Sequence, residues 1–193
     1  MTGLELYESW RRLGAKVICR HEFAKTGLTF SAVMPLPLVV PAAAGLLAAG
    51  YFLEDISAMQ VQEGFLITYH YDSTAHPGRV AVRALADARG EAPSIASVYQ
   101  GAEWHEREAS DFLGIRFIGN PNPVPLLLPP DFPGRPPLWR AEGARASLAA
   151  LGLFGQAEVL DPAWEPIVNP PAPAKEEKAE EAKAEKAKKG GAS

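Results

Sequence analysis

The chain has 193 residues, an apolar fraction of 47% and a charged fraction of 22%, which is typical of a globular protein with one main domain. Its 19 basic and 23 acidic residues give a formal net charge of −4, and no Lys/Arg cluster is interleaved with aromatic residues, so nucleic acid is not expected as a partner. The single cysteine, Cys19, excludes an internal disulfide and a cysteine-based cluster site, and its alternating apolar surroundings predict a buried side chain.

The first half of the chain predicts helices and strands in turn. Residues 3–14 place apolar side chains on one helical face. The N-terminal sequence lacks the basic start and apolar run of a secretory signal, so no such signal is expected. Strands are expected at 16–23 and 28–34, joined by a turn at "KTG". The uncharged stretch 32–53 has the length of a membrane span, but three prolines interrupt its first half. We interpret it as a strand end, a turn and a buried helix over 41–50.

Three more strands are expected in the next part of the chain. "YFLEDISAMQV" and "GFLITYHYD" predict strands, the second of them rich in aromatic and β-branched residues, and "RVAVRALA" has the alternation of a half-buried antiparallel strand. The predicted fold class is therefore α+β, with a mixed, mostly antiparallel sheet covered by helices and followed by an extended proline-rich C-terminal segment.

A charged stretch, "AEWHEREASDFLG", holds the candidate functional residues. The stretch belongs to the longer sequence "APSIASVYQGAEWHEREASDFLG". We expect a helix there that starts at Ser94, is divided near Gly101 and stops at Gly114. A helical wheel separates two faces. The face directed to the core holds His105, Ala109, Phe112 and Leu113; the opposite stripe holds Trp104, Arg107, Glu108 and Asp111.

The same stretch lacks the residue spacing of two common hydrolytic sites. A zinc-hydrolase helix needs a second histidine four residues after His105, where this chain has Ala109. Glu106 and Glu108 are two positions apart on a helix and point in nearly opposite directions, so they cannot flank one bond. Two interpretations of the stripe remain: a solvated, salt-bridged face, or an interface patch, which Trp104 and the proline-rich sequence that follows favour.

Residues 119–140 contain eight prolines in 22 positions together with many large apolar residues. Such a segment forms neither a helix nor an inner strand, and its apolar groups need a surface, either its own domain or another protein. Residues 141–155 predict one short helix, "DPAWEPIVNPPAP" an extended stretch, and residues 175–193 a charged Ala/Lys/Glu tail without fixed structure. The expected divisions are 1–118, a domain; 119–174, a partner-binding segment; and 175–193, the tail.

The stretch "PSIASVYQGAEWHEREASDFLGIRFIGNP" closely resembles the signature of the 30 kDa subunit family of respiratory complex I, the NADH:quinone oxidoreductase. "EDISAMQ", "FLITYHY", "RVAVRA" and "DFPGRPPLWR" extend the likeness to residues 45–140. Asn120 stands where the family usually has His, and Val124 where it has a basic residue. The signature positions are Pro93, Ser94, Trp104, Glu106, Arg107, Glu108, Asp111, Phe112, Leu113, Gly114, Ile115, Phe117, Gly119 and Pro121.

The resemblance implies a non-catalytic assembly subunit in the peripheral arm, on the cytoplasmic side of the membrane and without a membrane span of its own. It also implies that this chain holds no cofactor or metal, that iron–sulfur clusters, FMN and quinone are bound by partner subunits, and that the chain docks on the hydrogenase-like large subunit beside the iron–sulfur subunits. The residues expected at the partner interface are Trp104, Arg107, Glu108, Asp111, Leu126, Leu127, Leu128, Phe132 and Trp139.

Other functions remain open at this point. The first is the equivalent subunit of a related complex whose electron donor is ferredoxin, F420 or a hydrogenase. The second is a stand-alone hydrolase that uses His105 and nearby carboxylates. The third is a scaffold whose segment 119–140 binds small recognition modules as an isolated peptide.

Overall fold

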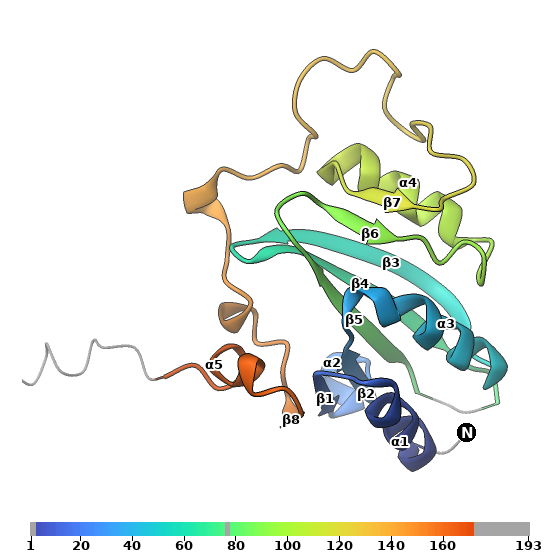
Figure 1. The fold of residues 1–193 in the computed structure, drawn as a ribbon, viewed down its shortest axis with the longest axis vertical. Coiled ribbons are helices and arrows are strands. Elements are labelled where there is room, and N and C mark those ends of the chain that lie inside the picture. The colour runs from blue at the N-terminus through green and yellow to red at the C-terminus, as the bar shows by residue number, and fades with distance from the viewer. Residues whose placement is uncertain (1–2, 76–77, 172–193) are drawn as a thin grey trace, which may run out of the picture.

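The computed structural model describes residues 3–75 and 78–171 and confirms the α+β class (Figure 1). Its centre is a six-stranded sheet in the order β3-β4-β5-β2-β1-β8, in which β2 and β5 are parallel and every other neighbouring pair is antiparallel. The strands are β1 Val17–Arg20, β2 Phe30–Val33, β3 Phe52–Val61, β4 Gly64–Asp72, β5 Val80–Ala86 and β8 Gln156–Val159. The strand predictions at 51–61 and 64–72 are confirmed.

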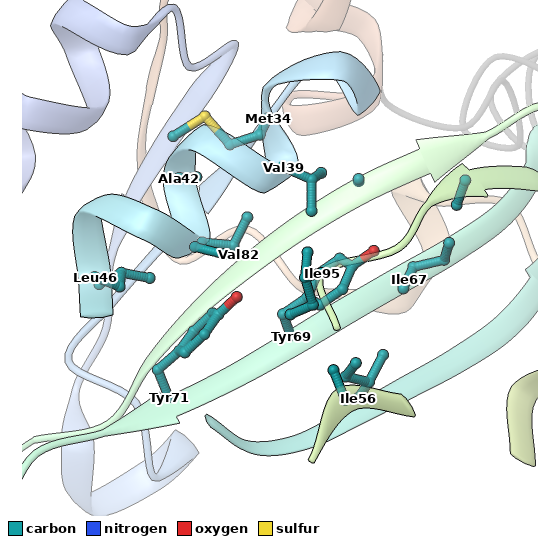
Figure 2. Close-up of a cluster of buried hydrophobic side chains, with 14 of the residues drawn as sticks. Met34, Val39, Ala42, Leu46, Ile56, Ile67, Tyr69, Tyr71, Val82 and Ile95 are labelled. Carbon is teal, nitrogen blue, oxygen red and sulfur yellow. The ribbon is translucent and has the colours of Figure 1, made fainter. Parts of the chain in front are cut away.

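One face of this sheet is covered by three helices, α1 (Gly3–Leu13), α3 (Val39–Ala48) and α4 (Ala102–Leu113). The main core lies between these helices and the strands, and Figure 2 shows side chains of α3 meeting those of β4 and β5. Tyr69 and Tyr71 of β4 and Trp10 of α1 are among its largest fully buried side chains. Each large apolar side chain buried in this way contributes about 1.5–3 kcal/mol.

The opposite face is covered by the C-terminal part of the chain. Alternate residues of the strands point to this side, and the cluster joins Val17, Cys19 and Leu66 to Leu148 and Trp164. Cys19 is fully buried, as the sequence predicts, and burial raises the pKa of its thiol. β8 belongs to the same C-terminal part and forms the edge of the sheet beside β1.

The strand β5 is not half-buried, as its alternation predicted, because it lies between β4 and β2 under both covering layers. Even Arg83 is only 5% exposed. Its Nη1 donates a 2.6 Å hydrogen bond to Ser31 Oγ, which also hydrogen-bonds His21 Nε2 at 2.7 Å. Burial, and then the charge of Arg83, lower the pKa of His21.

The turns between elements differ from the sequence prediction in two places. The "KTG" turn is part of a short helix, α2 (Phe23–Thr26), so the first strand ends earlier than expected. A 3-10 turn, Leu36–Leu38, precedes α3, which therefore begins two residues before the predicted start at 41. Every helix in residues 3–75 and 78–171 is too short or too polar to cross a bilayer.

The predicted helix start at Ser94 is wrong. Residues Glu91–Pro93 form β6, which pairs in parallel with β7 (Arg116–Ile118), and the Ser94 N–H continues this ladder to the carbonyl of Ile118 at 2.9 Å. Turns then lead to α4, which begins only at Ala102. The Ser94 hydroxyl accepts a 3.1 Å hydrogen bond from the Ala96 N–H in this turn and donates to the Glu106 side chain in a tertiary contact.

Beyond residue 140 the sequence prediction also fails locally. Residues 141–155 form two 3-10 turns, Glu142–Ala144 and Ala149–Leu151, and not one helix. The stretch expected to be extended holds a 3-10 turn, Pro162–Trp164, and α5 (Glu165–Val168), because Trp164 packs under the second face of the sheet. The predicted charged tail, 175–193, lies outside the described residues.

Candidate functional site

Helix α4 organises the candidate site. It lies along β3, the edge strand of the large sheet, and the chain continues from it into β7 and then into the proline-rich segment, residues 119–140 (Figure 1). The helix ends at Gly114, whose φ of 75° is left-handed and whose N–H bonds the carbonyl of Ser110. The predicted stop at Gly114 is therefore confirmed.

Glu106 points into the protein, although it is charged. Its side chain is fully buried and accepts three hydrogen bonds: 2.6 Å from Ser94 Oγ, 2.8 Å from the Ile95 N–H and 2.8 Å from Asn120 Nδ2. The carboxylate thus joins α4 to the turn after β6 and to the start of the proline-rich segment. This is a fold-organising role, because all three donors belong to the same chain.

The electrostatics around Glu106 oppose its ionisation only in part. Burial raises the pKa of Glu106, while the hydrogen bonds from Ser94, Asn120 and Ile95 lower it, and the balance lies above the ordinary value. Burial, and then the nearby Glu106 carboxylate, raise the pKa of Tyr69. Within the described residues, the hydroxyls of Tyr69 and Tyr71 are buried without a hydrogen-bond partner.

Arg107 lies on a different side of α4 and binds the proline-rich segment. Its Nε donates to the carbonyl of Val124 at 2.9 Å, and its Nη2 to the carbonyl of Pro125 at 3.1 Å. Its Nη1 donates to Glu103 Oε1 at 3.1 Å, one helical turn earlier. The side chain is 11% exposed. The ion pair therefore runs from Arg107 back to Glu103.

Asp111 holds the next part of the segment. Its Oδ2 accepts hydrogen bonds from the backbone N–H groups of Leu126, Leu127 and Leu128, at 2.9, 2.7 and 3.0 Å. Burial alone would raise the pKa of Asp111, but these three donors and the charge of Arg107 outweigh it, so its pKa lies below the ordinary value. Asp111 is thus 9% exposed and not on a solvated stripe, because the segment lies over it.

Two contributors, Glu103 and Asn122, were not predicted from the sequence. Glu103 Oε1 accepts from both Arg107 and Asn122 Nδ2, the latter at 3.0 Å. The Glu103 carbonyl also receives a 3.3 Å hydrogen bond from Asn120. The spacing of Glu103 and Arg107, four residues apart on a helix, was the available signal; the link from Glu103 to Asn122 has no local signal.

The remaining polar residues of the stretch do not meet around one reacting point. His105 Nδ1 lies 3.1 Å from Asp55 Oδ1 of β3, whereas the hydrogen bonds of the Glu106 carboxylate are made in the interior. Glu108 is exposed. In the part of the chain that the structure describes, no group of three or more His, Cys, Asp and Glu side chains could hold a metal ion.

The large apolar residues of the predicted interface divide into two groups. Trp104 is 61% exposed, Leu127 60% and Phe132 39%, while Leu126 and Leu128 are half-buried. Trp139 instead packs partly into the core, with its ring 5.9 Å from that of Phe65. The backbone beside it is fixed as well, since the N–H of Leu138 bonds the carbonyl of Phe112 at 2.9 Å.

The other signature residues shape the connection from α4 to this segment. Ile115 and Phe117 are buried in the main core, on either side of Arg116 in β7. Gly119 has a φ of 93°, which glycine adopts without strain, and turns the chain toward Asn120. Pro121 is exposed.

Comparison with known proteins gives the family context of this site. The sequence model of the family described as "Respiratory-chain NADH dehydrogenase, 30 Kd subunit" matches residues 39–142, which include α4 and the whole proline-rich segment. A subunit of the NADH-quinone oxidoreductase from a Nocardioides species is 44% identical over 69 residues, 35% of this chain and 28% of that protein. The mitochondrial NADH-ubiquinone oxidoreductase 30.4 kDa subunit of Neurospora crassa is 33% identical over 87 residues, 44% of this chain and 31% of that protein.

Solved structures share the fold. A trypsin-resistant fragment of Nqo5, residues 1–134, has a TM-score of 0.52 at 24% identity and covers 62% of this chain and 97% of that one. A chain of the membrane-bound sulfane sulfur reductase, an archaeal respiratory membrane complex, has a TM-score of 0.52 at 20% identity and covers 61% and 71%. The sequence matches to the Nocardioides and Neurospora proteins span less than a third of each protein's length.

Proposed function

This chain belongs to the family of the respiratory-chain NADH dehydrogenase 30 kDa subunit, and we propose from this that it is a non-catalytic assembly subunit of a proton-translocating NADH:quinone oxidoreductase. In this role it lies in the peripheral arm and docks on the hydrogenase-like large subunit, beside the iron–sulfur subunits. The whole complex is the enzyme, and this chain contributes a binding surface to it.

One observation carries the docking proposal: large apolar side chains are exposed on a backbone that is itself firmly held. Trp104, Val124 and Leu127 are each more than half exposed, while Arg107 and Asp111 fix the backbone at residues 124–128. Exposed tryptophan and leucine side chains on an ordered surface are typical of protein contacts. The partner surface would therefore be apolar where it meets them.

The cofactors of the complex belong, in this proposal, to partner subunits. An iron–sulfur cluster is held by several cysteine thiolates, and this chain has one cysteine, which is buried in the sheet. The buried carboxylate Glu106 already has three donors from its own chain, so it is satisfied without a ligand. Iron–sulfur clusters are therefore assigned to the neighbours, FMN and quinone are assigned to them by the family resemblance, and the role of this chain is positioning.

The proposed location is the cytoplasmic side of the membrane, as a peripheral subunit. The family supports the membrane association: the relatives are named as subunits of NADH–quinone oxidoreductases, and one structural neighbour comes from a respiratory membrane complex. The cytoplasmic side is what the family resemblance of the signature implies. This chain would be attached to the membrane through its partners.

The decisive experiment is a tagged pull-down of the chain from gently solubilised native membranes, with mass spectrometry of the partners and a visible spectrum. We expect co-purification with a hydrogenase-like large subunit, iron–sulfur proteins and a flavin-containing NADH module. Recovery of the large subunit with a ferredoxin-, F420- or hydrogenase-linked module would instead assign the chain to a related complex. A colourless, solitary chain would overturn the assembly role.

A further inference from the structure

Prolines limit the backbone hydrogen bonds that the proline-rich segment can make with itself. Pro121, Pro123 and Pro125 have no N–H group, so the backbone around them cannot form a regular ladder, although the Val124 N–H bonds the Asn122 carbonyl at 2.8 Å. The planar fork of Arg107 reaches two successive carbonyls, those of Val124 and Pro125. A lysine, whose ammonium is a single point charge, does not match this geometry.

The three leucines that follow present the opposite requirement. Their N–H groups need an acceptor, and a single oxygen of Asp111 receives all three. Arg107 and Asp111 are four residues apart, so they lie on the same face of α4 and act on adjacent stretches of the segment. We name this pair the Arg107–Asp111 clamp. It fixes five consecutive residues, 124–128, by hydrogen bonds to their main chain.

The clamp determines which side chains face outward. Both clamp residues are used by the main chain and are largely covered, with Arg107 at 11% and Asp111 at 9% exposure. Val124 and Leu127, whose backbones they hold, are 52% and 60% exposed. Trp104, one turn before Arg107 on α4, is 61% exposed. The residues that hold the segment and the residues that it displays are therefore different.

We propose that Arg107 and Asp111 are positioning residues, which order the main chain of residues 124–128 in the free subunit so that Val124 and Leu127 are displayed before docking. This inference rests on the proposed function. Ordering a backbone residue is unfavourable in entropy, and a surface that is ordered beforehand does not lose this entropy on binding. The occupant is an apolar patch of the large subunit, and the clamp residues themselves do not contact it.

The first test measures the clamp in the free, full-length chain by hydrogen exchange with peptide-level mass spectrometry. In Arg107→Lys, which keeps the charge and loses the fork, and in Asp111→Asn, amides 126–128 should exchange about tenfold faster or more, a loss of ~1.4 kcal/mol of local protection. The Ile95 amide, held by Glu106, is an internal reference and should not change. Arg89→Lys is the matched control, since Arg89 is an exposed arginine on a turn.

The second test measures docking by titrating the purified chain onto membranes from a strain that lacks it. Leu127→Ala and Arg107→Lys should each raise the Kd about tenfold, equivalent to ~1.4 kcal/mol. In the double variant the two losses should not add, because Leu127 is no longer displayed once the clamp is lost. Additive losses would overturn the inference, since they would make Arg107 an independent contact.

Two other results would also overturn it. A raised Kd for Arg107→Lys with unchanged exchange at 126–128 would mean that Arg107 contacts the partner directly. Faster exchange with an unchanged Kd would mean that the order of the segment does not serve docking. Both results leave the assembly role standing. If the wild-type chain does not bind these membranes at all, the proposed function itself fails.

Discussion

The hydroxyl of Ser94 donates a 2.6 Å hydrogen bond to Oε2 of Glu106, which joins residues of two different parts of the fold, the turn after β6 and the middle of α4. The Ile95 N–H and Asn120 Nδ2 bond the same carboxylate. A buried carboxylate with three donors is strongly coupled to its surroundings, because the Ser94 hydroxyl and the Ile95 N–H lose this acceptor when the carboxylate is removed, whereas Asn120 Nδ2 keeps its bond to the Glu103 carbonyl.

Glu106→Ala should therefore lower the free energy of unfolding by about 3 kcal/mol or more, since it removes the acceptor of the Ser94 hydroxyl and the Ile95 N–H and leaves a cavity behind. Glu106→Gln should cost less, about 1–3 kcal/mol, because glutamine fills the same space and keeps one acceptor oxygen. The remaining cost arises because its amide NH2 faces groups that are themselves donors. Denaturant unfolding of the full chain measures both. Glu108→Gln, an exposed neighbour, is the control and should stay within about 0.5 kcal/mol of wild type. Equal effects at the two positions would contradict the buried network.

Asp111 should make stability depend on acid pH. Its pKa is lower in the folded chain than its ordinary value of 3.8, so its contribution is fully present above that value and is lost as the pH falls through the folded pKa. Asp111→Asn cannot titrate, and the difference in unfolding free energy between wild type and this variant should shrink below about pH 4. Unfolding curves across that range give the comparison. A difference that grows toward acid would refute the assigned sign.

Gly114→Ala should destabilise the chain by about 1–2 kcal/mol. The residue has a left-handed φ of 75°, and an added Cβ would lie 3.1 Å from Pro136 Cγ of the proline-rich segment. Gly101→Ala is a matched control at the other end of α4, where φ is −61° and nothing lies within 4 Å of an added Cβ. That variant should be neutral or stabilising by up to about 1 kcal/mol. Thermal unfolding of both variants measures the two effects. Equal changes in stability at Gly114 and Gly101 would show that helix propensity, and not the left-handed conformation of Gly114, sets the cost.

The buried Arg83 should contribute, together with the burial of the ring, to the lowered pKa of His21. Burial and the charge of Arg83 both lower the pKa of His21, so Arg83→Met should move that pKa back toward its ordinary value of 6.5. The shared contact through Ser31 Oγ places the two side chains close enough for this effect. A two-dimensional NMR titration of the imidazole measures it directly. An unchanged or lower His21 pKa in the variant would show that desolvation alone sets the value.

The lowered pKa of His21 should also make the free energy of unfolding depend on pH. A histidine with a lowered folded pKa is held neutral in the folded chain, so the folded state loses stability as the pH falls below 6.5. Arg83→Met should reduce this loss. Stability that is flat between pH 7 and 5 in both proteins would contradict the prediction.

Local composition was sufficient for some elements. The strand β4 is rich in aromatic and β-branched residues, which favour a strand, and β3 and β4 lie where the sequence predicted them. The end of α4 at Gly114 and the burial of Cys19 follow for the same reason, since each depends on local conformation or on immediate neighbours. The α+β class and the family also follow from the sequence, the latter through the Glu-Arg-Glu stretch.

Only the tertiary structure decided the roles within that stretch. A helical wheel places Asp111 on a solvated stripe, but residues 126–128 return over it, and no periodicity in α4 encodes a contact with a segment fifteen to seventeen residues away. Ser94 has the chemistry of a helix cap, yet its hydroxyl binds Glu106 because β6 and β7 bring it there. Likewise, β8 and the short helices after residue 140 form because the second face of the sheet needs an apolar cover. These contacts join residues that are far apart in the sequence, and burial and hydrogen bonding between them arise only in the folded chain. Sequence patterns report on residues that are neighbours in the chain, so they do not predict such contacts.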